Sequence, residues 1–314
     1  MNAVSPNRLD VGIHKGVPEA TYHADPAITP SASSGVLRTL VQRSPEHAWM
    51  THPRLNMVRK DKSSTEAMNR GTILHALVLN TPHPHRVLHV ADYRSAAARD
   101  QRDAALAAGL IPVKADDMEE LEDVASAIRS RLLALPEVWS AMQAAISEGM
   151  SEATLIWQER GVLCRCRYDT LPPATYRATY DLKFTGLSAE PDAFGKKVTG
   201  DYAFQADLYP RAVRALRGDR PLFVFLAAET EAPYGVSLHA LDPEAADLAR
   251  QKVDAALAQW AECLRSGEWP SYPPLVHFHG AKPWELTAWD NRQERERVVH
   301  GLTGNPGLAS EQRA

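Results

Sequence analysis

The chain has 314 residues, of which 44% are hydrophobic and 24% are charged, and its formal net charge at pH 7 is −4. These values are ordinary for a soluble globular protein and argue against a broad basic surface for nucleic acid, although a narrow channel needs only a few cationic groups. No apolar stretch reaches the ~18 residues of a membrane span, no secretory signal is recognised, and three cysteines do not suggest a disulfide framework, so we expect a cytoplasmic protein.

The first half of the chain is predicted to be mainly helical. Residues 1–20 are polar and show no clear period, so we expect them to be loose. Apolar residues recur every three to four positions over residues 116–134, which predicts an amphipathic helix that Pro136 ends. Another helix is expected over residues 65–79, where His75 lies among apolar neighbours. On local grounds such a histidine is more often a core residue than a metal ligand.

The next segment is predicted to form strands. Three candidates cover residues 152–158, 162–168 and 175–184, and because turn residues separate them we expect a meander. Alternation along the second strand turns Tyr168 to one side and Arg167 to the other. A mostly helical half followed by strands indicates a fold that mixes both.

Two acids and one lysine are expected to converge between the second and third strands. Asp169 follows the second strand directly, and a hairpin would bring it near Asp181. A period of two places Asp181 and Lys183 on the same face of the third strand. Mg²⁺ and Mn²⁺ prefer oxygen ligands, so an ion held by both carboxylates would offset their repulsion, polarise a phosphoryl oxygen and activate a bound water. Lys183 would orient that water or stabilise charge on the phosphate.

A polar helix face follows these strands. Residues 201–216 predict a helix on which Gln205 and Tyr209 lie four positions apart, hence on one face. Three arginines on or near this helix could contact a DNA backbone or form a solvated face: Arg211, Arg214 and Arg217. On spacing alone, a D-x-K pattern such as Asp181-x-Lys183 is more often part of a solvated surface hairpin than of a metal site. Gln205 and Tyr209 could equally be two unrelated surface residues.

Taken in order, these motifs resemble the RecE-type exonucleases of phages and prophages, in the RecB-nuclease-like branch of the PD-(D/E)xK superfamily. The resemblance spans about residues 20–290, and the ordered set of His, R-x-D, D-x-K and Q-x-x-x-Y is more specific than any single motif. The matching residues are Tyr22-His23 through Ser31-x-Ser33, Ser44-Pro45 with Trp49, Gly71-x-x-x-His75, Glu152 with Trp157, Cys164 through Asp169, Asp181-Leu182-Lys183, Gln205-x-x-x-Tyr209, and Gly267 through Pro270.

The resemblance implies an α/β fold with a restriction-endonuclease-like core, in which a central mixed sheet is flanked by helices and joined to a helical N-terminal part. We expect one nuclease domain over residues 21–290. It would comprise the helical part at 21–150, the catalytic core at 151–265 and a C-terminal arm at 266–290, and a disordered tail would follow at 291–314.

The resemblance also implies a metal site. Its ligands would be His75, Asp169, Asp181 and the backbone carbonyl of Leu182, and Lys183 would be the catalytic lysine. The metal would be Mg²⁺, for which Mn²⁺ substitutes. Three cysteines cannot supply the four ligands of the iron–sulfur cluster that some relatives carry, so we expect none.

Four further residues would support the site or contact DNA: Glu152, Arg167, Gln205 and Tyr209. Gln205 and Tyr209 would hold the acidic strand or a DNA phosphate from the flanking helix, and Glu152 stands where relatives often carry another acid. The chain departs from many superfamily members in that its second acid, Asp181, is not a glutamate. The proline that precedes the first acid in the superfamily's name is also absent, as is common in the RecB-like branch.

The activity that the resemblance implies is 5′-to-3′ degradation of linear double-stranded DNA, which leaves a 3′ single strand for a phage annealing protein. A ring-shaped homo-oligomer without a membrane anchor is expected. Three alternatives stay open: an endonuclease of the same superfamily, a catalytically silent DNA-binding or recombination scaffold, and a metal hydrolase of nucleotides or RNA. The intact Asp169, Asp181 and Lys183 count against the silent scaffold, because it has no chemical need for all three.

Overall fold

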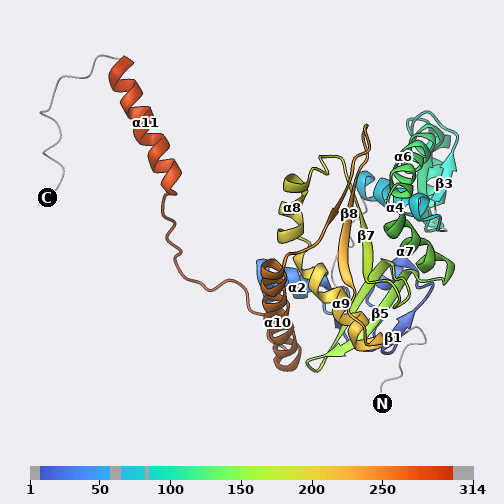
Figure 1. Cartoon of the computed structure of the whole chain (residues 1–314), viewed down its shortest axis with the longest axis horizontal. Coiled ribbons are helices and arrows are strands. Elements are labelled where there is room, and N and C mark those ends of the chain that lie inside the picture. The colour runs from blue at the N-terminus through green and yellow to red at the C-terminus, as the bar shows by residue number, and fades with distance from the viewer. Residues whose placement is uncertain (1–7, 57–64, 82–84, 300–314) are drawn as a thin grey trace, which may run out of the picture. The chain divides into compact units, whose positions relative to one another are not determined.

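A computed structural model gives the fold, and it describes residues 8–56, 65–81 and 85–299. The chain divides into two compact units, Met1–Ser271 and Tyr272–Ala314, each of which is described by itself. The larger unit holds two layers of helices with strands between them (Figure 1). It is a mixed α/β fold, as the sequence predicts.

The first sheet is built on an antiparallel hairpin of β5 (Ser151–Glu159) and β6 (Val162–Thr170). β1 (Gly12–His14) pairs with β5 in the antiparallel sense, and β2 (Ser31–Ala32) pairs with the start of β6 in the parallel sense. Part of the segment 1–20, which the sequence predicts to be loose, is therefore an edge strand. Hydrogen bonds between its backbone and that of β5 order this segment. The side-chain pattern does not encode such bonds.

The second sheet contains β7 (Ala178–Thr185), β8 (Leu222–Glu229) and β9 (Val236–His239). β7 runs parallel to β8, and β9 is antiparallel to β8. The predicted ladder between the second and third strands is therefore wrong, since β7 pairs with β8 and not with β6. The two prolines after Leu171 separate the strands, and a side chain bridges them instead: Thr170 Oγ1 donates to the carbonyl oxygen of Tyr180 at 3.1 Å.

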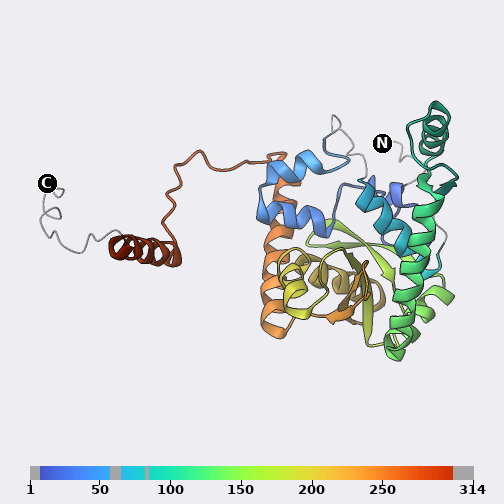
Figure 2. The same ribbon diagram turned by 90° about the horizontal axis from the view of Figure 1, so that it is seen from above.

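One face of the sheets is covered by a helical layer that buries the larger core. It consists of α2 (Ser34–Gln42), α9 (Ala203–Arg217) and α10 (Pro243–Ser266), with α3 (Pro45–Thr51) and α8 (Pro191–Gly200) beside them (Figures 1 and 2). The largest side chains in this core are fully buried aromatics from strands and helices alike: Trp157, Tyr168, Phe194, Phe204, Phe225 and Trp260.

The other face is covered by α4 (Glu66–Leu79), α6 (Ala115–Leu133) and α7 (Pro136–Ser147). The predicted helix over 116–134 is confirmed, because the apolar stripe of α6 is buried against Leu182 and other residues of β7 and β8. A small parallel pair, β3 (His85–Leu88) and β4 (Ile111–Lys114), is joined by α5 (Ala96–Ala107). The sequence pattern does not predict this pair.

The smaller unit contains α11 (Pro283–Val299), whose side chains are all exposed. The sequence predicts an arm up to residue 290 and disorder beyond it, whereas the structure has a helix from 283 to 299; residues 300–314 lie outside the described part. Two local interactions account for the helix: Glu285 accepts from the backbone N–H of Lys282 at 3.0 Å, and Arg292 pairs with Glu296 one turn later. None of the helices in the described ranges combines the length and the hydrophobicity that a membrane span requires.

Candidate metal site

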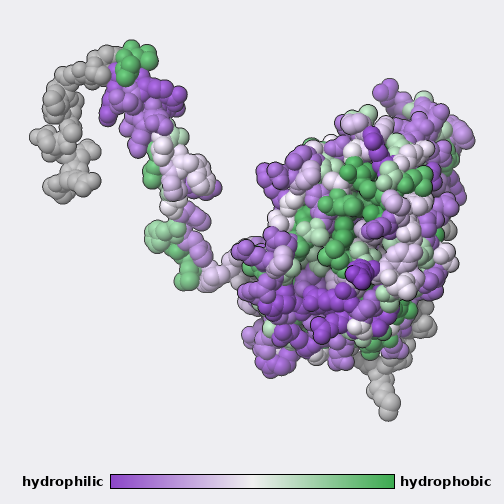
Figure 3. Space-filling model, viewed as in Figure 1, coloured by the Kyte–Doolittle hydropathy of each residue, from purple (hydrophilic) through white to green (hydrophobic). Residues whose placement is uncertain are grey.

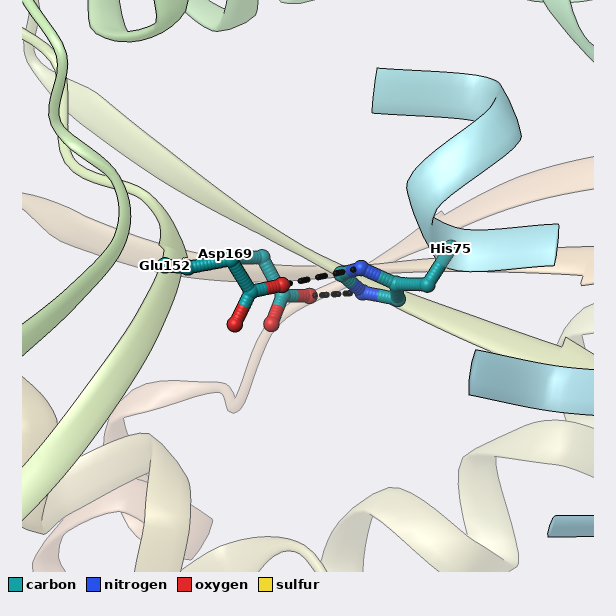
Figure 4. Close-up of side chains that lie close together, drawn as sticks. All are labelled: His75, Glu152 and Asp169. Carbon is teal, nitrogen blue, oxygen red and sulfur yellow. Dashed lines mark ion pairs between the residues drawn. The ribbon is translucent and has the colours of Figure 1, made fainter. Parts of the chain in front are cut away.

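The His75 side chain points from α4 to the carboxylates of Glu152 and Asp169 (Figure 4). Its Nε2 lies 2.8 Å from Asp169 Oδ2, and its Nδ1 lies 3.3 Å from Glu152 Oε1. The helix that presents it is fixed at both ends, because the Thr65 side chain accepts from the backbone N–H of Met68 and Asn80 ends the helix in a left-handed conformation. His75 is thus not a histidine enclosed by apolar neighbours.

Glu152 and Asp169 stand opposite each other on β5 and β6, between residue pairs that keep regular antiparallel register. Glu152 itself has φ +53°, a left-handed conformation that is costly for a residue with a side chain and interrupts the ladder at this point. Arg167 holds its carboxylate, since Nε donates to Glu152 Oε2 at 2.5 Å while Nη1 donates to the carbonyl oxygen of Val17 at 2.7 Å. Both carboxylates therefore meet the same imidazole.

A second group forms around Asp181, whose side chain is 2% exposed. Lys183 pairs with Asp181 Oδ2, as their shared face predicts, and Gln205 of α9 donates to Asp181 Oδ1 at 2.6 Å. The ammonium group of Lys183 also lies 5.4 Å from the ring centre of Tyr202 and 5.9 Å from that of Phe225. These two aromatic faces restrict where the ammonium can lie.

The two groups meet through the backbone of β7. The N–H of Leu182 donates to Asp169 Oδ2 at 2.7 Å. In an extended strand the N–H and C=O of one residue point to the same side, so the Leu182 carbonyl also faces β6. His75 and Asp169 thus meet the backbone of β7 at the junction of the two sheets, although no backbone ladder joins β6 to β7. The Asp181 carboxylate is not among the ligand atoms that lie within 4.8 Å of one another.

Charges within the site shift the pKa values of its groups in opposite directions. Burial opposes a charged imidazole, but the carboxylates of Asp169 and Glu152 outweigh it and raise the pKa of His75 to about 10. Burial likewise opposes ionisation of Asp169, yet His75, Lys183 and the Leu182 N–H together hold the pKa of Asp169 below its usual value. In the metal-free protein His75 and Asp169 are therefore an ion pair.

Asp181 behaves differently from Asp169. Burial and the charge of Asp169 raise the pKa of Asp181 to about 6, although Lys183 opposes the shift. Burial would lower the pKa of Lys183, but the two aspartates raise it, so the lysine stays charged. Repulsion between the two acids is therefore only partly relieved, and further positive charge would relieve it.

The donor groups fit a divalent cation. Among the described residues, His75, Glu152 and Asp169 each offer a ligand atom, and these atoms lie within 4.8 Å of one another. Ligands of one ion at ~2.1 Å can be up to ~4.2 Å apart, so little movement is needed. Carboxylate oxygens with one imidazole nitrogen suit Mn²⁺ well and Mg²⁺ acceptably. Glu152, whose role the sequence left uncertain, is therefore close enough to be a ligand.

The sequence matches the family model described as "PDDEXK-like domain of unknown function (DUF3799)" over residues 39–276, which is more than half of the chain. The chain belongs to this PDDEXK-like family. Its membership places it in the PD-(D/E)xK superfamily that the motifs indicate.

The fold of this PDDEXK-like chain is similar to the crystal structure of a Eubacterium rectale protein named "Putative exonuclease". The TM-score is 0.53 with 13% sequence identity, and the match covers 88% of this chain and 99% of that chain. At this identity the likeness concerns the fold alone. None of the curated proteins compared matches the chain.

Two tyrosines of the PDDEXK-like domain pack against residues that neighbour or bind the site carboxylates. Tyr209 is buried and packs on Tyr168, the neighbour of Asp169, with ring centres 5.1 Å apart, so it supports the acidic strand and is not exposed to solvent. Tyr22 of α1 (Glu19–His23) lies with its ring 5.9 Å from the guanidinium of Arg167, and burial raises the pKa of Tyr22 to about 12. Tyr22 belongs to one of the motifs that carry the family resemblance, but its position in the sequence predicts no role in the site.

The arginines of α9 are mostly engaged within the fold. Arg211 binds Asp207, Glu159 and Asp254, and Arg217 binds Asp219. The surface over α9 and α10 is strongly hydrophilic (Figure 3), which fits this network of paired charges. Arg211 and Arg217 are therefore poor candidates for contacts with a DNA backbone, whereas Arg214 is exposed.

Proposed function

We propose that this PDDEXK-like protein is a Mg²⁺-dependent deoxyribonuclease, and specifically a 5′-to-3′ exonuclease of the RecE type that acts on linear double-stranded DNA. The observation that best supports this function is the convergence of His75, Glu152 and Asp169 beside the ion pair of Asp181 and Lys183. A purely structural role needs neither the strained backbone of Glu152 nor a lysine held beside a buried acid.

His75, Asp169, Asp181 and the Leu182 carbonyl would hold the cation, and Glu152 offers a further carboxylate. When bound, Mg²⁺ polarises a phosphoryl oxygen and lowers the pKa of a coordinated water. His75 must lose its proton before its nitrogen can act as a ligand, because it is charged in the metal-free protein.

The remaining residues orient these groups. Lys183 places a fixed positive charge beside Asp181, where it can orient the attacking water or stabilise the charge that develops on the phosphate. Gln205 fixes the other oxygen of Asp181, and Arg167 fixes Glu152. Tyr209 keeps the acidic strand in place through Tyr168.

The products of the proposed reaction are nucleotides and a 3′ single-stranded end, which an annealing protein of phage type would bind. We further propose a ring-shaped homo-oligomer acting in the cytoplasm. Such a ring would keep the enzyme on one DNA end without a broad basic exterior, which fits a net charge of −4.

The test uses purified protein with Mg²⁺ on three substrates: linear duplex labelled at one 5′ end, closed circular duplex, and single-stranded DNA. Loss of the linear duplex alone, with the 5′ label released first as a small product, supports the proposal. A nicked circle supports the endonuclease instead, and preferred cleavage of RNA or free nucleotides supports the hydrolase. Asp169→Asn is the inactive control.

The second candidate is the silent DNA-binding scaffold. It predicts that metal-loaded protein binds duplex ends and leaves every substrate intact. The same assay with a binding measurement on the linear duplex separates the two functions.

A further inference from the structure

Gly71 lies in the interior of α4, one turn before His75, and neither backbone geometry nor packing accounts for it. Glycine lowers the stability of a helix interior relative to alanine. Glycine is usually needed where the backbone adopts a positive φ. Gly71 is not among the residues with positive φ in the described chain. A reason other than backbone conformation is therefore needed.

Crowding by the protein does not supply that reason. Among the described residues, a Cβ placed on Gly71 would meet no heavy atom within 4 Å outside the backbone of its own helix. The contrast is Gly235, where a Cβ would lie 2.7 Å from Glu229 Oε2 and the Glu229 side chain would have to move. At Gly71 the described protein leaves the space open.

This open space adjoins the metal site. Residues four apart lie on the same face of a helix, about one turn or 5.4 Å apart along its axis. Helical side chains also lean towards the N-terminus, so a side chain on Gly71 would extend the His75 face of α4 by about one further turn. Gly71 is itself partly exposed.

We propose that Gly71 is a nucleic-acid contact position, at which the sugar–phosphate backbone of the strand entering the site lies directly against the backbone of α4. The proposal rests on the nuclease function proposed above. A glycine is needed there because the ligand, and not the protein, fills the space where a side chain would stand. Gly71 would thereby set how closely a strand can approach the ligands on His75 and Asp169.

Two substitutions in the full chain test the proposal. Gly71→Ala should raise the melting temperature of the DNA-free protein by about 1–3 °C, because alanine favours the helix and fits the space. Gly71→Leu should leave the melting temperature within about 2 °C of wild type. It should also preserve the increase in melting temperature that Mn²⁺ causes. Its Kd for linear duplex, measured by fluorescence anisotropy with Ca²⁺ in place of Mg²⁺, should rise at least 10-fold.

The matched control is Gly195→Leu. Gly195 is the corresponding glycine inside α8, where a Cβ also meets nothing within 4 Å in the part of the chain that the structure describes. α8 packs on the opposite face of the β7–β8 sheet from α4. Its Kd for duplex should match that of wild type.

Three results overturn the proposal. One is a Gly71→Leu variant that binds duplex within 2-fold of wild type, and another is equal weakening by Gly195→Leu. The third is a fall of more than about 5 °C in the melting temperature of Gly71→Leu, which shows that the space is not free. If wild-type protein cleaves duplex while Gly71→Leu binds it normally, only the contact is refuted, whereas wild-type protein that neither binds nor cleaves DNA refutes the nuclease function as well.

Discussion

Asp181→Asn should make the metal-free protein more stable while it abolishes cleavage. The change removes one negative charge from a side chain that is 2% exposed and lies near the charge of Asp169. The amide oxygen can still accept the hydrogen bond from Gln205. A residue kept for metal binding at the expense of stability should respond in this way.

The magnitude follows from the pKa of Asp181, which burial and Asp169 raise from 3.8 to about 6. A group whose pKa is higher in the folded state contributes stability below its unfolded pKa and loses that contribution as the pH rises through its folded pKa. At ~1.4 kcal/mol for each pKa unit, the ionised acid costs on the order of 1–3 kcal/mol at pH 7. The increase in the free energy of unfolding caused by Asp181→Asn should therefore be present at pH 7 and absent at pH 4.

Urea unfolding in EDTA at pH 4 and pH 7 measures the stability, and cleavage of linear duplex with Mg²⁺ measures the activity. We expect at least ~100-fold slower cleavage. Asp254→Asn is the control: burial opposes its charge, but Arg211 and Arg160 hold the pKa of Asp254 below its usual value, so this variant should lose stability at pH 7 and cleave normally. A loss of stability in Asp181→Asn at pH 7, or cleavage at the wild-type rate, refutes the reasoning.

Three further outcomes are expected. Lys183→Met should cleave ~100–1000-fold more slowly in single-turnover assays and still be stabilised by Mn²⁺; an unchanged rate removes the lysine from the mechanism. Mn²⁺ at 100 times its Kd should stabilise wild type by about 2.7 kcal/mol in thermal unfolding, and His75→Ala should lose most of this effect. Asp25 is fully buried, accepts hydrogen bonds from Ser31 and pairs with His52 and with Arg165, the latter at 3.2 Å. Burial opposes its charge, but His52, Arg165 and Ser31 together keep the pKa of Asp25 below its usual value. Asp25→Asn should therefore lose ~3–5 kcal/mol in urea at pH 7, and the difference should shrink as the pH falls below ~4; equal stability at pH 7 contradicts this.

Side-chain alternation was predictable because the two faces of a strand meet different surroundings. Tyr180, Leu182 and Phe184 face the layer of α4, α6 and α7, and Asp181 and Lys183 face the opposite way, towards α9, as a period of two requires. The helix of α6 was predictable for the same reason, since its apolar stripe is continuous.

Strand pairing was not predictable, because alternation shows which face is buried but not which strand lies alongside. The expected ladder between β6 and β7 is replaced by pairing of β7 with β8, which lies some forty residues further along the chain. Asp169 and Asp181 nevertheless come together, because the Leu182 N–H reaches the Asp169 side chain across the gap.

The part played by Glu152 also depends on tertiary structure. Its side chain reaches His75 through a left-handed backbone conformation that no local signal in the sequence marks. The link from Arg167 to Tyr22 likewise joins residues that are 145 positions apart. Distant contacts of this kind are absent from any local pattern.

The central claim is that one divalent cation is held where β6, β7 and α4 meet, and the most direct measurement is an anomalous difference map from crystals soaked in Mn²⁺. The proposed site predicts a peak within bonding distance of His75 Nε2 and the Asp169 carboxylate, with Asp181 beside it. A protein saturated with Mn²⁺ that shows no peak there, or a peak only elsewhere, contradicts the claim.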